Sequence, residues 1–579
     1  MALCSTPTPS QAQDVVEKWN ERYDGTTDGV HEGRAVAMDA AGNVVVTGRS
    51  VSSNAFDYYT VKYRASDGFE LWSDRYDGPG DADDVPVAVA IDAAGNVIVT
   101  GGSTGGSTGS SSGLDVYTRK YNGTTGSDLW NQRDDGPARG DDAATAIALD
   151  AEGNVIVTGS STGSGTGLDF YTAKYAAGTG SRLWSRRYNS PDNGNDAAVA
   201  VVVDASGDVL VTGLSRGGNG SIDWYTAKYD GTTDAVIWDE LEDGPGGGDD
   251  LARALALDAA GNAVVAGSVS NNGNLDFLTV KYAAADGSEL WSQRQNGTGN
   301  GEDRATAVAV DAAGDAVITG SSDNGRNLDL MVTKYSGADG SELWSERYNG
   351  PGDGDDGGTA IAIDPQGNVI VTGTSAGSND TQDFYTACYD GRTGQRIWFE
   401  RFDGPRQRDE VAFPFGLALG PLNSVAITGA TQMTDPPFAE FDFITILYTA
   451  DTTDADADGL PDAWEITHWG TTTGHGPADD DDLDGMVELL EYAFGGDPTF
   501  PDPSRLPEAV IEDGFLTFTL SKRAGVTLVV ESTGSLAQGE WSVASTTVIT
   551  DSAGILKVRD NVPTSAGQAR FLRVRVTAP

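Results

Sequence analysis

The chain has 579 residues, of which 38% are hydrophobic and 8% aromatic, an ordinary composition for folded domains. Its charge is unusual: 87 Asp and Glu oppose 37 Lys and Arg, giving a net charge of −50. Binding to phosphates requires a basic surface, so this charge excludes nucleic acid as a partner for most of the molecule. No apolar run in the sequence approaches the length of a membrane span, so we expect none.

The first thirteen residues predict no folded element. They lack the basic start and the apolar centre of a signal peptide, although Ser10–Gln13 is typical of the end of one. We therefore interpret residues 1–13 as the remnant of a targeting segment. Cys4 follows a bulky leucine, which disfavours a lipoprotein site, and two cysteines are too few for a disulfide framework.

A ten-residue phrase, Asp-Ala-Ala-Gly-Asn-Val-Val-Val-Thr-Gly at Asp39–Gly48, recurs along the chain. Variants of it occupy Asp92–Gly101, Asp150–Gly159, Asp204–Gly213, Asp258–Gly267, Asp311–Gly320 and Asp364–Gly373, with a degenerate copy at Gly420–Gly429. The turn glycines of the first seven copies are 53 to 58 residues apart. A nearly fixed period of this size predicts a repeat architecture.

Each repeat contains four predicted β-strands, A to D. In the first repeat they are Arg34–Asp39, Val44–Thr47, Asp57–Tyr63 and Glu70–Tyr76, separated by turn-forming residues. Four antiparallel strands in about 50 residues fit one blade of a β-propeller and are long for a solenoid coil. The sequence therefore predicts an all-β propeller.

Counting strands predicts eight blades. The last A, B and C strands are Phe413–Leu419, Ser424–Thr428 and Asp442–Tyr448, and no tryptophan-bearing D strand follows them. An unpaired D strand, Glu17–Tyr23, instead precedes the first A strand. We therefore predict an eight-bladed propeller over residues 14–449, with closure by the N-terminal strand. The D-strand tryptophans are Trp19, Trp72, Trp130, Trp184, Trp238, Trp291, Trp344 and Trp398.

Other side chains also recur: each C strand carries an Asp and a Tyr, and most D strands carry an Arg. A catalytic group is needed once, whereas a packing group is needed in every blade. We therefore interpret the tryptophans as wedges between blades and the recurrent charges as structural pairs. Cys388, which replaces a recurrent C-strand Lys, indicates drift within a strand.

A glycine lies four residues before most of the tryptophans, as at Gly68 and Gly126. This spacing resembles the Gly-x-x-x-Trp docking element of quinoprotein-like propellers. The whole unit resembles the bacterial SBBP-type beta-propeller repeat, over about three quarters of the chain. The resemblance implies the fold but hardly any function, because propellers include both enzymes and passive binders.

The connections from strand D to the next strand A are acidic and rich in Gly and Pro, as in Asp77–Asp84, Asp243–Asp250 and Asn349–Asp356. Propeller geometry places them on one face with the B-to-C loops, which are built of Ser, Gly and Asn, as in Ser103–Gly113. We expect a ring of carboxylates on this face. Its role stays open between cation binding, docking of a polar partner and a solvated rim, and some aspartates are expected to cap the next A strand.

Residues 450–500 carry the strongest chemical pattern. Asp454–Glu465 and Asp480–Glu491 each fit a twelve-residue calcium loop, with oxygen side chains at positions 1, 3, 5, 9 and 12, glycine at 6 and a backbone carbonyl at 7. The candidate ligands are Asp454, Asp456, Asp458, Leu460, Asp462 and Glu465, and Asp480, Asp482, Asp484, Met486, Glu488 and Glu491.

Each loop is expected to run into a short helix, at Pro461–His468 and Met486–Phe494. No helix is expected before the first loop, which departs from a full EF-hand. The module resembles the dockerin-like and thrombospondin type 3-like calcium repeats of bacterial extracellular proteins. The resemblance implies calcium as the cofactor and an extracellular or cell-surface location.

Residues 501–579 alternate as β-strands do, for example in Phe515–Leu520, Val526–Glu531 and Arg570–Val576. They predict a small C-terminal β-sandwich. It resembles the terminal modules that follow calcium repeats in secreted bacterial proteins, which implies attachment or sorting.

These observations favour a secreted or cell-surface calcium-binding propeller that acts as a binding, adhesion or structural scaffold. Its expected partner is a polysaccharide or an extracellular protein. Two alternatives stay open: a quinoprotein-like dehydrogenase, and a self-assembling extracellular lattice or fibre subunit that forms homo-oligomers.

We expect no enzyme, because the sequence has no vicinal cysteines, no Cys-x-x-Cys-His, no His-Glu-x-x-His, no nucleophile elbow and no phosphate loop. The eighth repeat diverges most, at Arg406–Phe413 and Met433–Phe438, and is the predicted place for any specific site.

Overall fold

The computed structural model describes residues 15–450 except for loop gaps at 26–28, 53–54, 80–81, 106–112, 139, 218–219, 245, 272, 378–380, 404–409 and 433–440. It also describes seven short stretches between residues 509 and 577. The only helical element in these parts is a 3-10 turn, Pro421–Asn423. No helix in the described ranges has the length and apolarity required to span a membrane.

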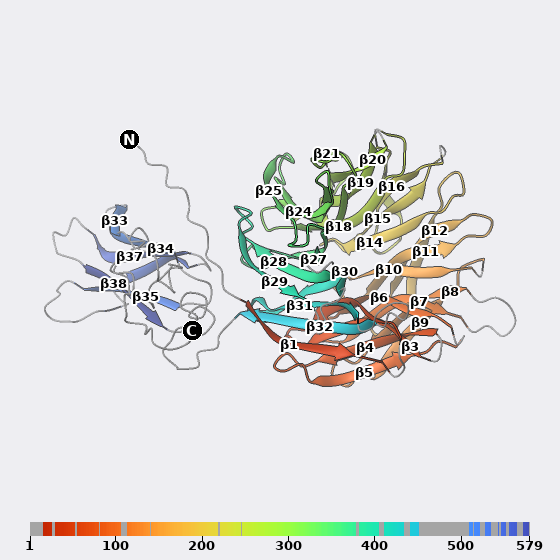
Figure 1. Cartoon of the computed structure of the whole chain (residues 1–579), viewed down its shortest axis with the longest axis horizontal. Helices are drawn as coiled ribbons and strands as arrows, with labels where there is room; N and C mark the ends of the chain where they lie inside the picture. The colour runs from red at the N-terminus through yellow and green to blue at the C-terminus, as the bar shows by residue number, and fades with distance from the viewer. Residues whose placement is uncertain are drawn as a thin grey trace. The chain divides into compact units, whose positions relative to one another are not determined.

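Residues 17–448 form one compact unit that contains eight four-stranded antiparallel sheets (Figure 1). We number the sheets 1 to 8 by their first strands. The first strands are β2 (His31–Met38), β6 (Asp84–Ile91), β10 (Asp142–Leu149), β14 (Ala197–Val203), β18 (Leu251–Leu257), β22 (Arg304–Val310), β26 (Gly357–Ile363) and β30 (Glu410–Leu419). The second strands are β3 (Val44–Ser52), β7 (Val97–Thr104), β11 (Val155–Thr162), β15 (Val209–Arg216), β19 (Ala263–Asn271), β23 (Ala316–Asp323), β27 (Val369–Ala376) and β31 (Val425–Gln432).

The third and fourth strands complete each sheet in chain order. The third strands are β4 (Ala55–Tyr63), β8 (Leu114–Tyr121), β12 (Leu168–Tyr175), β16 (Ile222–Tyr229), β20 (Asn274–Tyr282), β24 (Leu328–Tyr335), β28 (Gln382–Tyr389) and β32 (Phe441–Ala450). The fourth strands of sheets 1 to 7 are β5 (Glu70–Tyr76), β9 (Asp128–Asp134), β13 (Arg182–Tyr188), β17 (Val236–Glu242), β21 (Glu289–Gln295), β25 (Glu342–Tyr348) and β29 (Arg396–Phe402).

The fourth strand of sheet 8 comes from the other end of the unit. The order of this sheet is β30-β31-β32-β1, so β1 (Val15–Tyr23) pairs with the last strand of the unit. Figure 1 shows β1 in red beside β32 in cyan. Each first strand also lies against the first strand of the next sheet, and β30 lies against β2. The sheets therefore form a closed ring, and the chain is a β-propeller repeat protein.

The recurrent phrase builds the hairpin between the first two strands. Asp39 accepts hydrogen bonds from the backbone of Ala41 and Asn43, and Gly42 has a φ of +80° that favours glycine. The valines that follow are fully buried, as at Val45. The phrase ends at Gly48 because the first strand bulges there, and a Cβ on this glycine would lie 2.0 Å from the Glu32 carbonyl oxygen.

The tryptophans join neighbouring sheets, as the sequence predicts. Trp130 of sheet 2 donates a hydrogen bond of 3.1 Å from Nε1 to the Ala177 carbonyl of sheet 3. Its ring packs on Gly180, where a Cβ would lie 2.6 Å from the indole. The same pairing joins Trp72 to Gly126 and Trp344 to Gly394. The Gly-x-x-x-Trp spacing therefore places each glycine beneath the tryptophan of the preceding sheet.

The recurrent C-strand lysines are buried partners of the phrase aspartates. Lys62 Nζ lies 2.7 Å from Asp39 Oδ2 and donates to the Gly123 carbonyl of the next sheet. Burial acts to raise the pKa of Asp39, but hydrogen bonds from Lys62 and Asn43 outweigh it and hold the pKa below its usual range. Equivalent ion pairs lie at Lys120–Asp92, Lys174–Asp150, Lys228–Asp204, Lys281–Asp258 and Lys334–Asp311.

Sheet 7 departs from this arrangement. Cys388 is buried at the lysine position, next to the phrase aspartate Asp364. Burial raises the pKa of Asp364, although hydrogen bonds from Asn368 oppose it. Cys388 therefore does more than drift: it removes the cation that sheets 1 to 6 place beside this carboxylate.

Replacing Cys388 by lysine is expected to stabilise the protein by about 1–2 kcal/mol at neutral pH, the worth of roughly one pKa unit or slightly more. In the native protein Asp364 has a raised pKa, so its ionisation opposes folding. In the variant, the lysine at position 388 would lower the pKa of Asp364, so that ionisation would favour folding. The gain is therefore expected to be complete above the raised pKa of Asp364 in the native protein and to disappear as the pH falls through the lowered pKa of Asp364 in the variant. Thermal unfolding of both proteins between pH 3 and 8 measures this; an equal or larger gain at pH 3 would contradict it.

The described strands after residue 508 belong to a second unit with two sheets. One has the order β33-β34-β37-β36, from Ala509–Glu512, Phe515–Ser521, Ile555–Pro563 and Thr546–Asp551, and the other pairs β35 (Thr527–Thr533) with β38 (Phe571–Thr577). Leu520, Leu528 and Val558 are buried. β33 and β36 were not expected from the sequence.

Candidate metal centres

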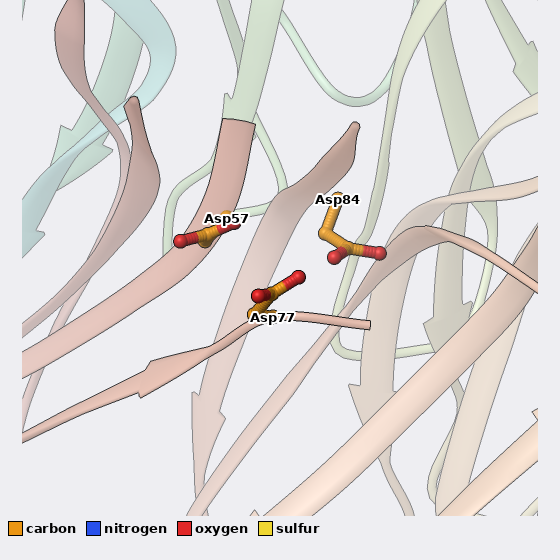
Figure 2. Close-up of side chains that lie close together, drawn as sticks. All are labelled: Asp57, Asp77 and Asp84. Carbon is orange, nitrogen blue, oxygen red and sulfur yellow. The ribbon is translucent and has the colours of Figure 1, made fainter. Parts of the chain in front are cut away.

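Three aspartates converge where sheet 1 meets sheet 2 (Figure 2). Asp57 lies on strand β4, Asp77 directly follows β5, and Asp84 begins β6. One carboxylate oxygen of each lies within 4.8 Å of the other two. Asp57 and Asp84 are buried and Asp77 is exposed, so the group opens toward solvent through Asp77.

The same arrangement occurs at two further junctions, in Asp115, Asp135 and Asp142, and in Asp223, Asp243 and Asp250. Two ligands that each lie 2.3–2.6 Å from one calcium ion are at most about 5 Å apart. Hard divalent cations prefer carboxylate oxygens, so each group has the ligand type and spacing that such a cation needs.

The third aspartate of each group also caps its strand. Asp250 accepts hydrogen bonds from the backbone N–H of Gly244 at 2.6 Å and of Ser270 at 2.7 Å. Asp84 does the same with Gly78 and Thr104. The capping role expected from the sequence is confirmed, and these bonds hold the D-to-A loop against the end of the second strand.

The groups differ in how their charge is neutralised. Arg75 Nη1 lies 2.8 Å from Asp57, and Arg133 Nη1 lies 2.9 Å from Asp115. In sheet 4 an exposed leucine, Leu241, stands at the arginine position. No Lys or Arg in the described ranges pairs with Asp223, Asp243 or Asp250, so this group, the sheet 4 triad, has three carboxylates and no cation.

The pKa directions in the sheet 4 triad follow from this. Burial raises the pKa of Asp223, and the charges of Asp243 and Asp249 raise it further. Burial also raises the pKa of Asp250; backbone hydrogen bonds oppose this, and the charges of Asp223 and Asp243 add to it. A divalent cation held among the three would remove the repulsion and lower both pKa values.

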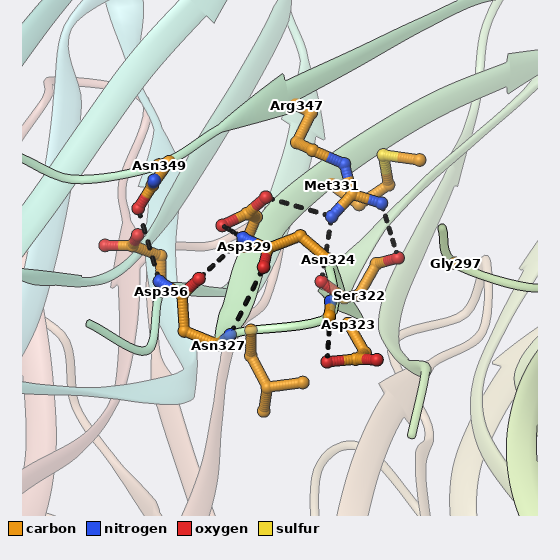
Figure 3. A network of polar contacts seen from close by, with 12 residues as sticks. Gly297, Ser322, Asp323, Asn324, Asn327, Asp329, Met331, Arg347, Asn349 and Asp356 are labelled. Carbon is orange, nitrogen blue, oxygen red and sulfur yellow. Dashed lines mark hydrogen bonds and ion pairs between the residues drawn. The ribbon is translucent and has the colours of Figure 1, made fainter. Parts of the chain in front are cut away.

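Other junctions replace the exposed aspartate by asparagine: Asn189, Asn296 and Asn349. Asn349 donates from Nδ2 to Asp353 Oδ1 at 2.8 Å, and Asp353 has a φ of +53°. Figure 3 shows the surrounding network, in which Arg347 contacts Asp329 and Ser322. An amide supplies its own donor, so these junctions close without a cation.

The junction after sheet 3 is intermediate. Asp169, Asn189 and Asp196 stand at the positions of the triads. Asp169 is 6% exposed, yet its Oδ1 has no hydrogen-bond partner, and the same holds for Asn189 Oδ1 and Ser190 Oγ. These three oxygens have no hydrogen-bond donor among the described residues. Asp169 and Asn189 stand where the triads have carboxylates, and Ser190 stands where they have glycine.

The sequence placed the carboxylate ring on the D-to-A loops but did not include the C-strand aspartates. Asp57, Asp115 and Asp223 complete the groups, 20 residues before the loop aspartate and 27 before the capping aspartate. This constant spacing was the signal that could have found them. All twelve predicted ligands between Asp454 and Glu491 lie outside the described residues, as do Arg406–Asp409 and Met433–Phe438 of the eighth repeat, so the prediction for them stays open.

Comparisons with known proteins find one family model and several solved structures to which the chain is similar. A family model described as "Outer membrane protein assembly factor BamB" matches residues 227–416, about a third of the chain. No curated protein matches the chain in sequence.

Several solved structures resemble the chain. BamB from Moraxella catarrhalis is 13% identical, with a TM-score of 0.43, over 75% of this chain and 100% of its own. Sqt1 from Chaetomium thermophilum is 11% identical, with a TM-score of 0.49, over 76% and 99%. Quinohemoprotein alcohol dehydrogenase from Comamonas testosteroni is 11% identical, with a TM-score of 0.45, over 86% and 89%. Similarities this distant say nothing about the activity or ligand of this chain.

Proposed function

We propose that this protein is a secreted or cell-surface calcium-binding scaffold. In this proposal the eight sheets are the blades of one propeller, and calcium binds at junctions between sheets, on the face that carries the D-to-A loops. The sheet 4 triad is the strongest site, and the observation that carries the proposal is its composition. Three carboxylate oxygens lie within 4.8 Å of one another with no neutralising Lys or Arg in the described ranges. The two triads with a paired arginine are weaker sites of the same kind.

A calcium ion at such a triad would keep open coordination positions. Calcium takes six to eight oxygen ligands, and three carboxylates supply only part of them. The exposed aspartate of each triad lies at the solvent side. The remaining positions would accept hydroxyl or carboxylate oxygens of a partner, which fits a polysaccharide or an extracellular protein.

We extend the proposal to the segment outside the described residues. Calcium in the loops Asp454–Glu465 and Asp480–Glu491 would order a dockerin-like helical connector to the C-terminal unit, whose two sheets we propose to pack as a β-sandwich. We assign no catalytic reaction to the chain. A second proposal is assembly into homo-oligomers, in which calcium would bridge neighbouring copies of the chain.

Binding of a partner is expected to require calcium. We would incubate the full-length protein with glycan and extracellular-protein arrays at about 2 mM calcium, near the level that saturates extracellular sites, and in parallel with excess EDTA. The proposal predicts a set of bound ligands that disappears with EDTA and returns with calcium. Binding that is equal in both conditions, or turnover of alcohols or sugars in a quinone-dependent dye assay, would contradict it.

A further inference from the structure

Stacked tyrosines recur at several junctions between neighbouring sheets. The last residue of a fourth strand stacks on a third-strand tyrosine of the next sheet, as Tyr76 does on Tyr117 at 4.4 Å between ring centroids. The Tyr76 hydroxyl accepts a hydrogen bond of 2.9 Å from Arg133 Nη2. The same stack forms at Tyr23–Tyr59, Tyr188–Tyr225 and Tyr348–Tyr385, with centroids 3.7 to 3.9 Å apart.

The junction between sheets 2 and 3 lacks this ring. Asp134 stands at the tyrosine position, and its carboxylate accepts hydrogen bonds from the hydroxyls of Tyr171 and Tyr175. Tyr171 is the counterpart of Tyr117, and no aromatic ring of the described residues stacks on it. Arg187 makes a cation–π contact with Tyr171, and its Cζ lies 5.2 Å from the ring centroid.

A second replacement enlarges the same space. Val116 pairs across the sheet with Asp134, as Tyr58 pairs with Tyr76. At the position of Val116 the other sheets have Tyr58, Phe170, Trp224, Phe277, Leu330, Phe384 and Phe443, of which only Leu330 is not aromatic. Two bulky rings are therefore replaced by small side chains at one junction.

A pocket of about 180 Å³ lies there. Its lining includes Val116, Tyr171 and Arg187. These are the counterparts of three groups that contact Tyr76 in the preceding junction: Tyr58 edge-on at 5.9 Å, Tyr117 stacked, and Arg133 at the hydroxyl. The pocket therefore occupies the space of the missing ring. A cavity of about 150 Å³ holds a benzene ring, so the volume suffices for one aromatic ring.

We propose that this pocket binds a phenolic ring, which takes the place of the missing tyrosine between Val116, Tyr171 and Arg187. Arg187 Nη2 donates to Ser161 Oγ, as Arg133 Nη2 donates to Ser103 Oγ while also reaching the Tyr76 hydroxyl. Arg187 is thus placed to donate to the phenol oxygen. A free phenol and a tyrosine side chain of a partner share this chemistry.

The test uses the full-length protein and ligand-observed NMR. p-Cresol is expected to bind, and toluene, which lacks the hydroxyl, to bind at least about fivefold more weakly, a difference typical of one hydrogen bond. A Gly-Tyr-Gly peptide separates the two sources: binding at least as tight as p-cresol assigns a protein tyrosine, and weaker binding assigns a free phenol. Absence of p-cresol binding, or equal binding of toluene, would overturn the proposal.

Two variants fill the pocket from neighbouring strands of sheet 2. Asp134→Tyr restores the missing ring, and Val116→Phe restores the cross-strand ring without changing Asp134; each is expected to lower p-cresol affinity at least about tenfold. Glu242→Tyr is the matched control, since it adds a tyrosine at the same strand position of sheet 4, where the facing residue is Leu278. It is expected to leave the affinity for p-cresol unchanged.

Unfolding midpoints confirm that each variant is folded. If neither filling variant changes the affinity for p-cresol, the assignment is refuted.

Discussion

Replacing Trp130 by alanine is expected to destabilise the ring by about 3–5 kcal/mol, the cost of truncating a buried tryptophan. Trp130 is 7% exposed, and its indole lies between sheets 2 and 3 among Val155, Tyr171 and Tyr175. The change removes the hydrogen bond to the Ala177 carbonyl and leaves a cavity above Gly180. Denaturant unfolding followed by tryptophan fluorescence and circular dichroism measures the loss.

Two controls separate the contact between sheets from general damage. Leu129, next to Trp130 on β9, is 47% exposed, and its change to alanine is expected to cost less than about 0.5 kcal/mol. Gly180→Val disturbs the same contact from sheet 3. Gly180 has a φ of +68°, and the Cβ of the valine would meet the indole of Trp130. A loss with Trp130→Ala no larger than with Leu129→Ala would contradict the role of the tryptophan.

Replacing Asp243 by asparagine is expected to weaken calcium binding at the sheet 4 triad by about ten- to a hundredfold, or roughly 1.4–2.7 kcal/mol. Asp243 is exposed, and asparagine occupies the same position in sheets 3, 5 and 6, so the fold tolerates the change. The variant loses one of three anionic ligands. Calorimetric titration of the full-length protein measures the loss as one missing or weakened site.

The matched controls use the same position in other sheets. Asp24→Asn makes the same charge change where His31 stands at the capping position, so no triad exists and calcium binding is expected to be unchanged. Asn296→Asp would complete a triad with Asp276 and Asp303 and is expected to add a site. Equal titrations of all three variants would contradict the assignment.

The pH dependence of this site has a defined sign. Burial and neighbouring carboxylates raise the pKa values of Asp223 and Asp250 above 3.8. Protons then compete with calcium at a higher pH than for exposed aspartates. The stabilisation that calcium provides is expected to be present at neutral pH and to be lost as the pH falls through these raised pKa values.

The scaffold was largely predictable from the sequence because its determinants are local. Each hairpin is specified by one phrase, in which Asp39, Gly42 and Gly48 have separate structural reasons. The N-terminal strand was predictable because the D-strand pattern of Trp19 occurs before the first repeat. The recurrent charges were also interpreted correctly as structural pairs, as Lys62 with Asp39 shows.

The candidate sites were less predictable because they combine segments from two sheets. Asp57 and Asp84 lie in different sheets, and although their constant spacing marks the positions, the three-dimensional arrangement is what brings their carboxylates together with Asp77. The pocket beside Asp134 is harder still. At this junction Asp134 and Val116 replace a tyrosine and a second aromatic residue. The space that this leaves is recognised only by comparison with the equivalent junctions, such as that of Tyr76 and Tyr117.

Calcium binding by the sheet 4 triad is tested most directly by locating the ion. Crystals of the full-length protein grown with calcium would give an anomalous difference map at a wavelength where calcium scatters anomalously. We predict a peak about 2.3–2.6 Å from carboxylate oxygens of Asp223, Asp243 and Asp250. A map with calcium peaks elsewhere in the molecule and none among these three aspartates would contradict the account.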